Sequence, residues 1–345
     1  MHATGTLMAV TGDLAAEVRA VRETVGIADR GGRAFTLLDG TDAVRFLQGM
    51  VTNDVDAIRV GSAAYALLLT PKARVVADMR LTRLADAAFL ADADQAAAAA
   101  LRTVLTRYRL GSKVAIEACD ERFGIVAVAG PQAAQLVADA LGVTPLANAA
   151  EGAGTEVELD AGVVHVLQSV FCGEQAYELI GPRAALDQAW ERLAAGLGRH
   201  DGRVFGDQAY DVLRVEAGVP RFGAEIDEQV MPAEAGVVDR AVSFTKGCYI
   251  GQEPVARLHY RGHANRGLRS ILLAGTAPEA GATVEVEGRE VGRITSAVES
   301  PTIGRAVALA IVRREVDPGQ RVGVVTADGV LEGELSAVPA YRWRA

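Results

Sequence analysis

The sequence predicts an α+β protein that ends in a small all-β domain. Up to about residue 217, strand-like runs alternate with helix-like runs, whereas from Leu268 onward short β-patterned runs are separated by Gly and Pro turns. The chain has 345 residues and half of them are hydrophobic, so at roughly 150 residues per domain it can build two or three cores. The predicted fold class rests on this change of pattern and on the length.

The first block of elements runs to residue 108. Thr41 is a helix-capping residue in front of a short amphipathic run, which Gly49 ends. Two β-rich runs flank Pro71-Lys72 and predict a strand pair. In order, the predicted elements are strand 34–39, helix 42–48, strands 65–70 and 75–83, and helix 94–108.

The second block begins near Phe123 and has the order strand, helix, strand, strand, helix. Pro131 and Pro182 each stand at the first position of a helix-like run, where proline is favoured. This order predicts a small α+β unit of the split-βαβ type. The predicted elements are strand 124–129, helix 132–141, strands 163–171 and 176–180, and a helix from Pro182 to about residue 197.

A helix over 207–217 follows, and Gly218 and Pro220 are its stop signals. The segment 220–267 is rich in Gly and charge and is predicted to be a long loop. The last part of the chain is predicted to be a separate β unit of the small-barrel type. Its predicted strands are 268–274, 283–286, 291–296, 305–312, 321–325 and 331–338.

The composition excludes several classes of protein. The 35 Lys and Arg against 44 Asp and Glu give a net charge of −9 without a basic stripe, which argues against sequence-independent nucleic-acid binding. The N-terminal run has no basic start followed by an apolar stretch, and no apolar run approaches the ~20 residues of a membrane span. Three cysteines without a CxxC pair favour a reducing compartment. We therefore expect a cytoplasmic protein with neither a nucleic-acid nor a membrane partner.

Common catalytic motifs are absent from the chain. There is no phosphate-binding GxxxxGK[ST], no GxGxxG after a strand, no GxSxG and no HExxH. The five histidines show no metal-ligand spacing with the cysteines, and His259 and His263 flank a loop-like run. No metal site is predicted.

The densest motif is Ser243–Arg257, which contains Lys246-Gly-Cys248-Tyr-Ile-Gly-Gln252-Glu. A lysine two residues from a thiol lowers the pKa of that thiol if the ammonium reaches it, and so favours the nucleophilic thiolate. Lys246 and Cys248 are therefore candidate catalytic residues. Gln252 and Arg257 follow as polar candidates for ligand binding at the start of a helix. The alternative is a buried cysteine in an ordinary turn.

Glu216 is a second candidate. It falls on the same face of the predicted helix 207–217 as the apolar residues Val212 and Leu213. It also lies near the C-terminal end, where the helix dipole disfavours an anion. A carboxylate that faces inward at the C-terminal end of a helix indicates a binding partner for its charge. A cationic or amidine-like edge of a ligand would be a suitable partner. The alternative is that the helix has frayed and Glu216 points to water.

Glu178 and Asp78 each interrupt an otherwise apolar strand run. Because side chains alternate along a strand, the simpler interpretation places each of them on a solvated face. Several such carboxylates in one chain would suit a polar ligand lodged between domains.

The run Lys246–Glu253, followed by Arg257, resembles the signature of the YgfZ family of folate-binding proteins, K-G-C-aromatic-x-G-Q-E and then Arg. From about residue 25 the chain is similar to the T-protein, the aminomethyltransferase of the glycine cleavage system. This wider similarity is carried by the segments 37–48, 51–55, 173–179 and 213–220 and by the C-terminal β unit.

The resemblance implies three domains arranged as a ring around a channel that holds tetrahydrofolate or a one-carbon derivative of it. A folate-binding domain would comprise residues 1–120 with 201–266, a ferredoxin-like α+β domain 121–200, and a β-barrel 267–345. Glu216 matches the carboxylate that binds the pterin ring, and Cys248 with Lys246 would be the reactive pair. Three further residues fall near folate-contacting stretches: Asn53, Asp78 and Glu178.

The resemblance also implies a role in the assembly or repair of iron–sulfur clusters, with client or assembly proteins as partners. One cysteine cannot hold a cluster alone, so no stably bound cluster is expected. Two alternatives stay open: a tetrahydrofolate-dependent aminomethyl or methyl transferase, and a non-catalytic interaction protein with a vestigial folate pocket. The oligomeric state is not predicted.

Two details bear on these alternatives. In aminomethyltransferases an aspartate assists the transfer, and the alignment puts an alanine of 96–100 at that position, with Asp92 and Asp94 nearby. Glu216, in contrast, leaves room for a folate-dependent transfer. The anionic folate tail would meet a positive mouth, for which three arginines after the signature are candidates: Arg257, Arg261 and Arg266.

Overall fold

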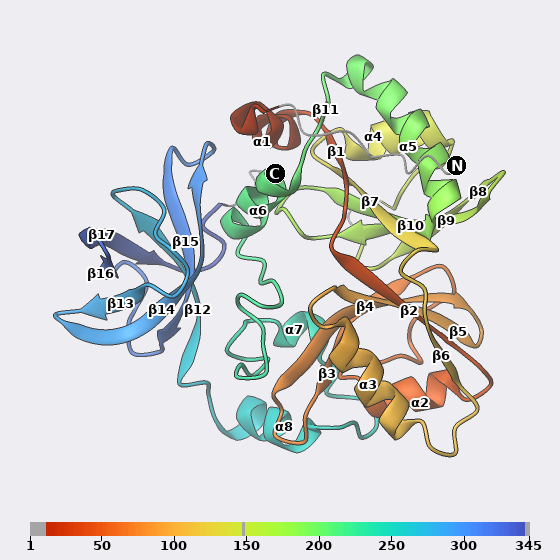
Figure 1. The fold of residues 1–345 in the computed structure, drawn as a ribbon, viewed down its shortest axis with the longest axis horizontal. Coiled ribbons are helices and arrows are strands. Elements are labelled where there is room, and N and C mark those ends of the chain that lie inside the picture. The colour runs from red at the N-terminus through yellow and green to blue at the C-terminus, as the bar shows by residue number, and fades with distance from the viewer. Residues whose placement is uncertain (1–11, 147–148, 342–345) are drawn as a thin grey trace. The chain divides into compact units, whose positions relative to one another are not determined.

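The computed structural model describes residues 12–146 and 149–341, and the chain packs into two compact units (Figure 1). Unit 1 takes its residues from 1–31 and 121–214, and unit 2 takes its residues from 32–120 and 215–345. This division differs from the expected one, which grouped the first 31 residues and 201–214 with the folate-binding domain. Residues 1–11, where a signal peptide was not expected, lie outside the described residues. Within the described ranges, no helix is long and apolar enough to cross a membrane.

Strand pairing explains why the N-terminal segment belongs to unit 1. β1 (Gly26–Asp29) pairs antiparallel with β7 (Phe123–Ala129) and parallel with β11 (Arg203–Val204). The resulting six-stranded sheet has the order β11-β1-β7-β10-β9-β8. Its other strands are β8 (Gly154–Leu159), β9 (Gly162–Ser169) and β10 (Ala176–Pro182). The helical elements are α1 (Leu14–Glu23), α4 (Ala133–Leu141), α5 (Arg183–Leu197), the short 3-10 helix η1 (Gly198–His200) and α6 (Asp207–Glu216), which leads into unit 2.

Apolar faces of α4 and α5 pack on the unit 1 sheet and form its core. Pro182, predicted to be the first residue of this helix, is the last residue of β10 and the N-cap of α5, one position before the first helical residue. The buried contacts are provided by Leu136 and Val137 of α4, Leu186 and Leu193 of α5, and Val126, Val128 and Leu179 of the sheet.

Unit 2 contains a five-stranded antiparallel sheet of order β3-β4-β5-β2-β6. The strands are β2 (Arg33–Asp39), β3 (Ala63–Leu69), β4 (Val75–Ala85), β5 (Ala88–Asp94) and β6 (Ala115–Ala118). One face is packed against α2 (Ala43–Met50) and α3 (Ala98–Tyr108), which fill the core with Leu47, Leu101 and Leu105. The alternation of β4 puts Ala77, Met79 and Leu81 into this core and turns the intervening residues to the opposite face.

The predicted helix 94–108 begins later, at Ala98, because Asp94 ends β5 and residues 95–97 form a turn between the strand and the helix. β5 itself pairs with both β2 and β4, and the sequence analysis predicted no element over 88–93. The short strands β6 and β8 were likewise not predicted. The predicted loop 220–267 holds two helices, α7 (Val238–Ala241) and α8 (Gln252–Arg261).

The six predicted C-terminal strands close into a barrel of order β12-β15-β14-β13-β16-β17. The barrel core is made of small and branched apolar residues, such as Ile271, Val284 and Ala308. The structure therefore confirms the α+β class with a terminal barrel. The strands are β12 (Arg266–Leu273), β13 (Thr283–Val286), β14 (Arg289–Ser300), β15 (Arg305–Arg313), β16 (Arg321–Thr326) and β17 (Gly329–Ser336).

Gly40, directly after β2, provides a first testable prediction. Its φ is +147°, and a Cβ there would lie 2.1 Å from the carbonyl oxygen of Lys113. Gly40→Ala is expected to lower the free energy of unfolding by about 1–3 kcal/mol, measured from urea denaturation. Gly31→Ala is the control, because an added Cβ there meets nothing within 4 Å. Equal losses in both variants would contradict the prediction.

Candidate functional site

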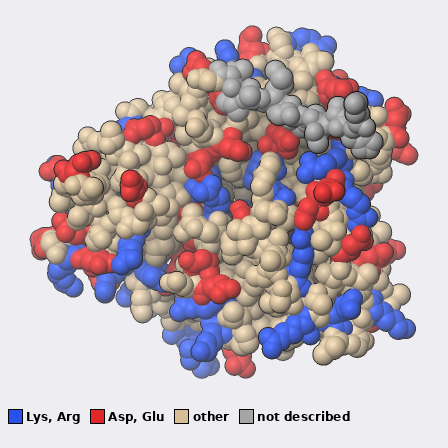
Figure 2. All heavy atoms as spheres, viewed as in Figure 1, with Lys and Arg blue, Asp and Glu red and all other residues tan. Residues whose placement is uncertain are grey.

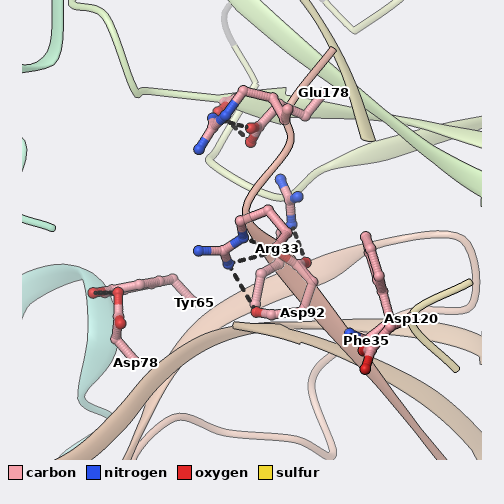
Figure 3. Close-up of polar contacts among 10 residues, drawn as sticks. Arg33, Phe35, Tyr65, Asp78, Asp92, Asp120 and Glu178 are labelled. Carbon is pink, nitrogen blue, oxygen red and sulfur yellow. Dashed lines mark hydrogen bonds and ion pairs between the residues drawn. The ribbon is translucent and has the colours of Figure 1, made fainter. Parts of the chain in front are cut away.

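Charged side chains line the face of the unit 2 sheet opposite its helices. β4 contributes Asp78 and Arg80, which lie two positions apart and so share a face. β5 contributes Asp92, the cross-strand partner of Arg80, and β2 contributes Arg33. Figure 3 shows Asp78 beside Tyr65 of β3, and Arg33 bonded to Asp92. The fold therefore gathers two carboxylates and two guanidinium groups on one sheet face.

Asp92 is buried, and each of its two carboxylate oxygens accepts a hydrogen bond from an arginine. Its Oδ1 accepts a hydrogen bond of 2.6 Å from Arg33 Nη2, and its Oδ2 accepts one of 3.0 Å from Arg80 Nε. Arg33 Nη2 also donates to the main-chain oxygen of Asp92 at 2.9 Å. Both guanidinium groups are themselves largely buried. This arrangement makes Asp92 a structural counter-ion.

Asp78 has a different environment, although it is also buried, with 8% of its surface exposed. Tyr65 donates its hydroxyl to Oδ2 at 2.9 Å, and Oδ1 has no hydrogen-bond partner among the described residues. Burial raises the pKa of Asp78 above its ordinary value, which outweighs the opposing attraction of Arg33 and the hydrogen bond from Tyr65. A buried carboxyl with one unpaired oxygen and a raised pKa is suited to bind an N–H donor or to accept a proton. The expectation that Asp78 lies on a solvated face was wrong, because the residue is buried.

The signature motif is tied to the same unit by Lys246. Its Nζ donates to the main-chain oxygens of Val51 and Asn53 at 2.7 and 2.8 Å. Burial lowers the pKa of Lys246 to about 8, although Asp54 and Asp56 oppose this shift. The expected role, activation of Cys248, stays a prediction, since no contact between the Lys246 ammonium and that thiol is found in the part of the chain that the structure describes.

The side-chain amide of Asn53, which was predicted to bind the ligand, forms hydrogen bonds with main-chain groups. Its Nδ2 donates to the main-chain oxygens of Tyr65 and Arg240, at 2.8 and 3.0 Å. Its Oδ1 accepts from the main-chain N–H of Asp54 at 2.8 Å. Asn53 thus fastens its own turn to β3 and to α7.

The other signature residues lie at the surface or at a helix start. Cys248 is an exposed free thiol, whereas the other two cysteines are buried. Gln252 is the first residue of α8, as expected of a polar helix start, and Arg257 is exposed on that helix. Of the expected positive mouth, Arg266 is engaged by Glu234 at 2.7 Å. On the face drawn in Figure 2, basic and acidic side chains are interspersed.

Glu216 ends α6 and is fully buried, so it points inward as predicted. Its Oε1 accepts a hydrogen bond of 2.5 Å from the hydroxyl of Ser300 on β14. A second buried carboxylate repeats this contact, because Glu225 Oε1 accepts from the hydroxyl of Ser296 at 2.6 Å. Two serines of one barrel strand therefore hold two carboxylates, one at the end of α6 and one in the segment that follows it.

Glu178 belongs to unit 1 and is buried on β10. Arg30 Nη1 donates to Oε1 at 2.6 Å and Ser169 Oγ donates to Oε2 at 2.8 Å. The guanidinium of Arg30 also lies 3.8 Å from the centre of the Tyr210 ring. The expected solvated position of Glu178 was wrong, because the residue is buried and Arg30, directly after β1, pairs with it.

Sequence reasoning did not single out Tyr65 or Arg33, and it named Asp92 only as a neighbour of the aligned alanine. A signal was available, since charged residues recur at every second position in β4 and again in β5. The signal was not used, because no strand was predicted over 88–93 and the partner of β4 was therefore not recognised. No group of three His, Cys, Asp or Glu side chains that could hold a metal ion occurs among residues 12–146 and 149–341.

Comparisons with known proteins agree with this architecture. Residues 8–246 match the family model described as the GCVT N-terminal domain, and residues 266–342 match the glycine cleavage T-protein C-terminal barrel domain. The chain is 30% identical over 340 residues to an aminomethyltransferase of Saccharopolyspora erythraea, covering 97% of this chain and 91% of that protein. It is 31% identical over 337 residues to an aminomethyltransferase of Cutibacterium acnes, covering 95% and 90%.

A solved structure is similar over nearly the whole chain. The glycine cleavage system aminomethyltransferase T from Bartonella henselae superposes with a TM-score of 0.83 at 25% sequence identity, covering 96% of this chain and 90% of that one. The fold of nearly the whole chain is therefore shared with this relative.

Proposed function

Because the chain belongs to the glycine cleavage T-protein family, we propose that it binds tetrahydrofolate and transfers an aminomethyl-type one-carbon unit at Asp78. This was the alternative function in the sequence analysis, and the aminomethyltransferase relatives support it better than the iron–sulfur role. The buried carboxyl of Asp78 carries the proposal, since Oδ1 is without a partner among the described residues.

The chemistry of the site fits a reduced folate. When bound, tetrahydrofolate supplies ring nitrogens that carry one-carbon units. Asp78 Oδ1 is a free acceptor for an N–H of such a ring, and Tyr65 fixes the carboxyl plane through Oδ2. With its pKa raised, Asp78 can hold a proton released by an amine at Oδ1 and return it to a leaving amine.

Glu216 is the proposed acceptor for the donor edge of the pterin. Its carboxylate is buried and is oriented by Ser300, whose Oγ also accepts from the main-chain N–H of Ile303 at 2.9 Å. That second bond fixes the serine hydroxyl so that it donates to Glu216. A carboxylate held in this way can accept from two N–H groups of an amidine-like edge.

Cys248→Ala provides the test that separates transfer from thiol chemistry. We expect this variant to keep tetrahydrofolate binding and at least half of the transfer rate, because the Cys248 thiol is exposed whereas the Asp78 carboxyl is buried. Binding is measured by anaerobic calorimetry and transfer by production of the one-carbon folate. Cys119→Ala, which removes a buried thiol, is the matched control. Loss of transfer in Cys248→Ala alone would contradict the proposal, and no binding at millimolar folate would favour a vestigial pocket.

A second candidate function is support of iron–sulfur cluster assembly or repair, as in the YgfZ group. The observation in its favour is that Cys248 is exposed in a loop whose Lys246 is anchored, while the other two cysteines are buried. In that function Cys248 meets client or assembly proteins at the surface. Restoration of cluster-enzyme activity in a depleted strain by the wild type but not by Cys248→Ala would support it.

A further inference from the structure

Lys246 reaches from the signature loop to the turn that follows α2. We call residues 51–53 the α2 turn; Lys246 Nζ donates to the first and last main-chain oxygens of this turn, on Val51 and Asn53. Bonds from an ammonium to a carbonyl are charge-assisted and short, here 2.7 and 2.8 Å. The turn also lies at the C-terminal end of α2, where the helix dipole favours a cation.

The α2 turn lies along β3, the edge strand of the sheet. Thr52 and Leu67 share two hydrogen bonds. The main-chain N–H of Thr52 donates to the main-chain oxygen of Leu67 at 3.0 Å, and the main-chain N–H of Leu67 donates to Thr52 Oγ1 at 2.9 Å. Asn53 Nδ2 then bonds the main-chain oxygen of Tyr65 at 2.8 Å. The turn therefore acts as an additional partner for β3, and Lys246 fixes both of its ends.

Tyr65 connects the α2 turn to Asp78. Its main chain is held by Asn53, and its hydroxyl is the one described side-chain donor to Asp78. We propose that Lys246 is a positioning residue for Asp78, acting through the α2 turn and Tyr65. This inference rests on the proposed function for its kinetic part, while the positioning itself is a property of the fold.

The charges around Lys246 make the positioning sensitive to pH. Asp54 and Asp56, which directly follow the α2 turn, stabilise its charged form, but burial prevails and lowers its pKa to about 8. From its own loop, the ring of Tyr249 lies 5.3 Å away, and burial raises the pKa of that phenol to about 12. From α7, Arg240 lies over the Tyr65 ring at 4.7 Å. Lys246 is therefore the group in this set that loses its charge near pH 8, and the charge-assisted bonds weaken above that pH.

The kinetic test uses Lys246→Met and Lys246→Arg in the full-length protein. Lys246→Met is expected to lower kcat for transfer by about 10- to 100-fold, with less than about a threefold change in KM for tetrahydrofolate, because a misplaced reacting group affects the chemical step. The wild-type kcat is expected to fall above about pH 8, and Lys246→Arg restores activity and removes this alkaline decline, since arginine keeps its charge. Unchanged kcat in Lys246→Met, or the same alkaline decline in Lys246→Arg, overturns the proposal.

Amide hydrogen exchange tests whether Lys246 positions β3, independently of any transfer activity. In Lys246→Met, amides of β3 are expected to exchange at least about tenfold faster than in the wild type, since the partner of the edge strand is released. Lys113→Met, which alters an exposed lysine, is the matched control and should leave β3 unchanged. If the wild type transfers no one-carbon unit, the proposed function fails and this measurement alone decides the positioning. Exchange in β3 that equals the control overturns it.

Discussion

Asp78→Asn is expected to abolish transfer, by about 100- to 10,000-fold in kcat, while tetrahydrofolate still binds. The amide cannot take up a proton as the carboxylate does, and removal of a positioned acid–base group has effects of this size. Tyr65 can still donate to the amide oxygen, so the local geometry is kept. The measurement is single-turnover transfer with calorimetric binding on the same samples.

The same variant is expected to be more stable than the wild type near neutral pH, by about 1 kcal/mol, since a buried carboxylate with an unmatched oxygen is costly. The pKa of Asp78 is raised, so its contribution to stability is complete at low pH and is lost as the pH rises through the raised value. The gain in Asp78→Asn therefore grows as the pH rises above the ordinary carboxyl pKa, and it levels off once the pH exceeds the raised pKa of Asp78. Asp86→Asn, at an exposed position after β4, is the control. A variant that is inactive and also less stable would indicate a structural role instead.

Asp92→Ala is expected to be the most destabilising single change on this sheet. It leaves Arg33 and Arg80 buried beside each other without their carboxylate, and breaking a buried pair in this way costs about 3–5 kcal/mol. Guanidinium denaturation of the purified variant measures the loss.

The exposed pair of Arg293 and Glu290 provides the comparison for this prediction. The two side chains are 68% and 56% exposed, and their closest N–O distance is 3.4 Å. Glu290→Ala is expected to change the free energy of unfolding by less than about 1 kcal/mol, because solvent screens exposed pairs. If Asp92→Ala costs no more than Glu290→Ala, the buried network contributes no net stability.

The elements with strong local signals were predicted well from the sequence. All six barrel strands were predicted because Gly and Pro turns separate them, and α5 was predicted because Pro182 marks its start. β5 and β8 were missed, since what makes them strands is pairing with distant neighbours. The propensity of nearby alanines points the other way.

The candidate site was predicted only in part, for a similar reason. Glu216 could be recognised because helix periodicity shows which residues face inward. The difference between Asp78 and Asp92 could not be predicted, since both interrupt apolar strands and only cross-strand register decides which one meets the arginines. The partners of Lys246 are main-chain oxygens almost 200 residues earlier in the chain, and no side-chain pattern encodes them.

The two serines of β14 fix the distance between the two carboxylates that they bind. Ser296 and Ser300 are four residues apart on one side of the strand, so they set the spacing of Glu225 and Glu216 at roughly 13 Å. A deletion of one residue between them would turn Ser300 to the opposite side and detach Glu216. We therefore expect the length of β14 between Ser296 and Ser300 to matter more to the protein than the identity of its outward-facing residues.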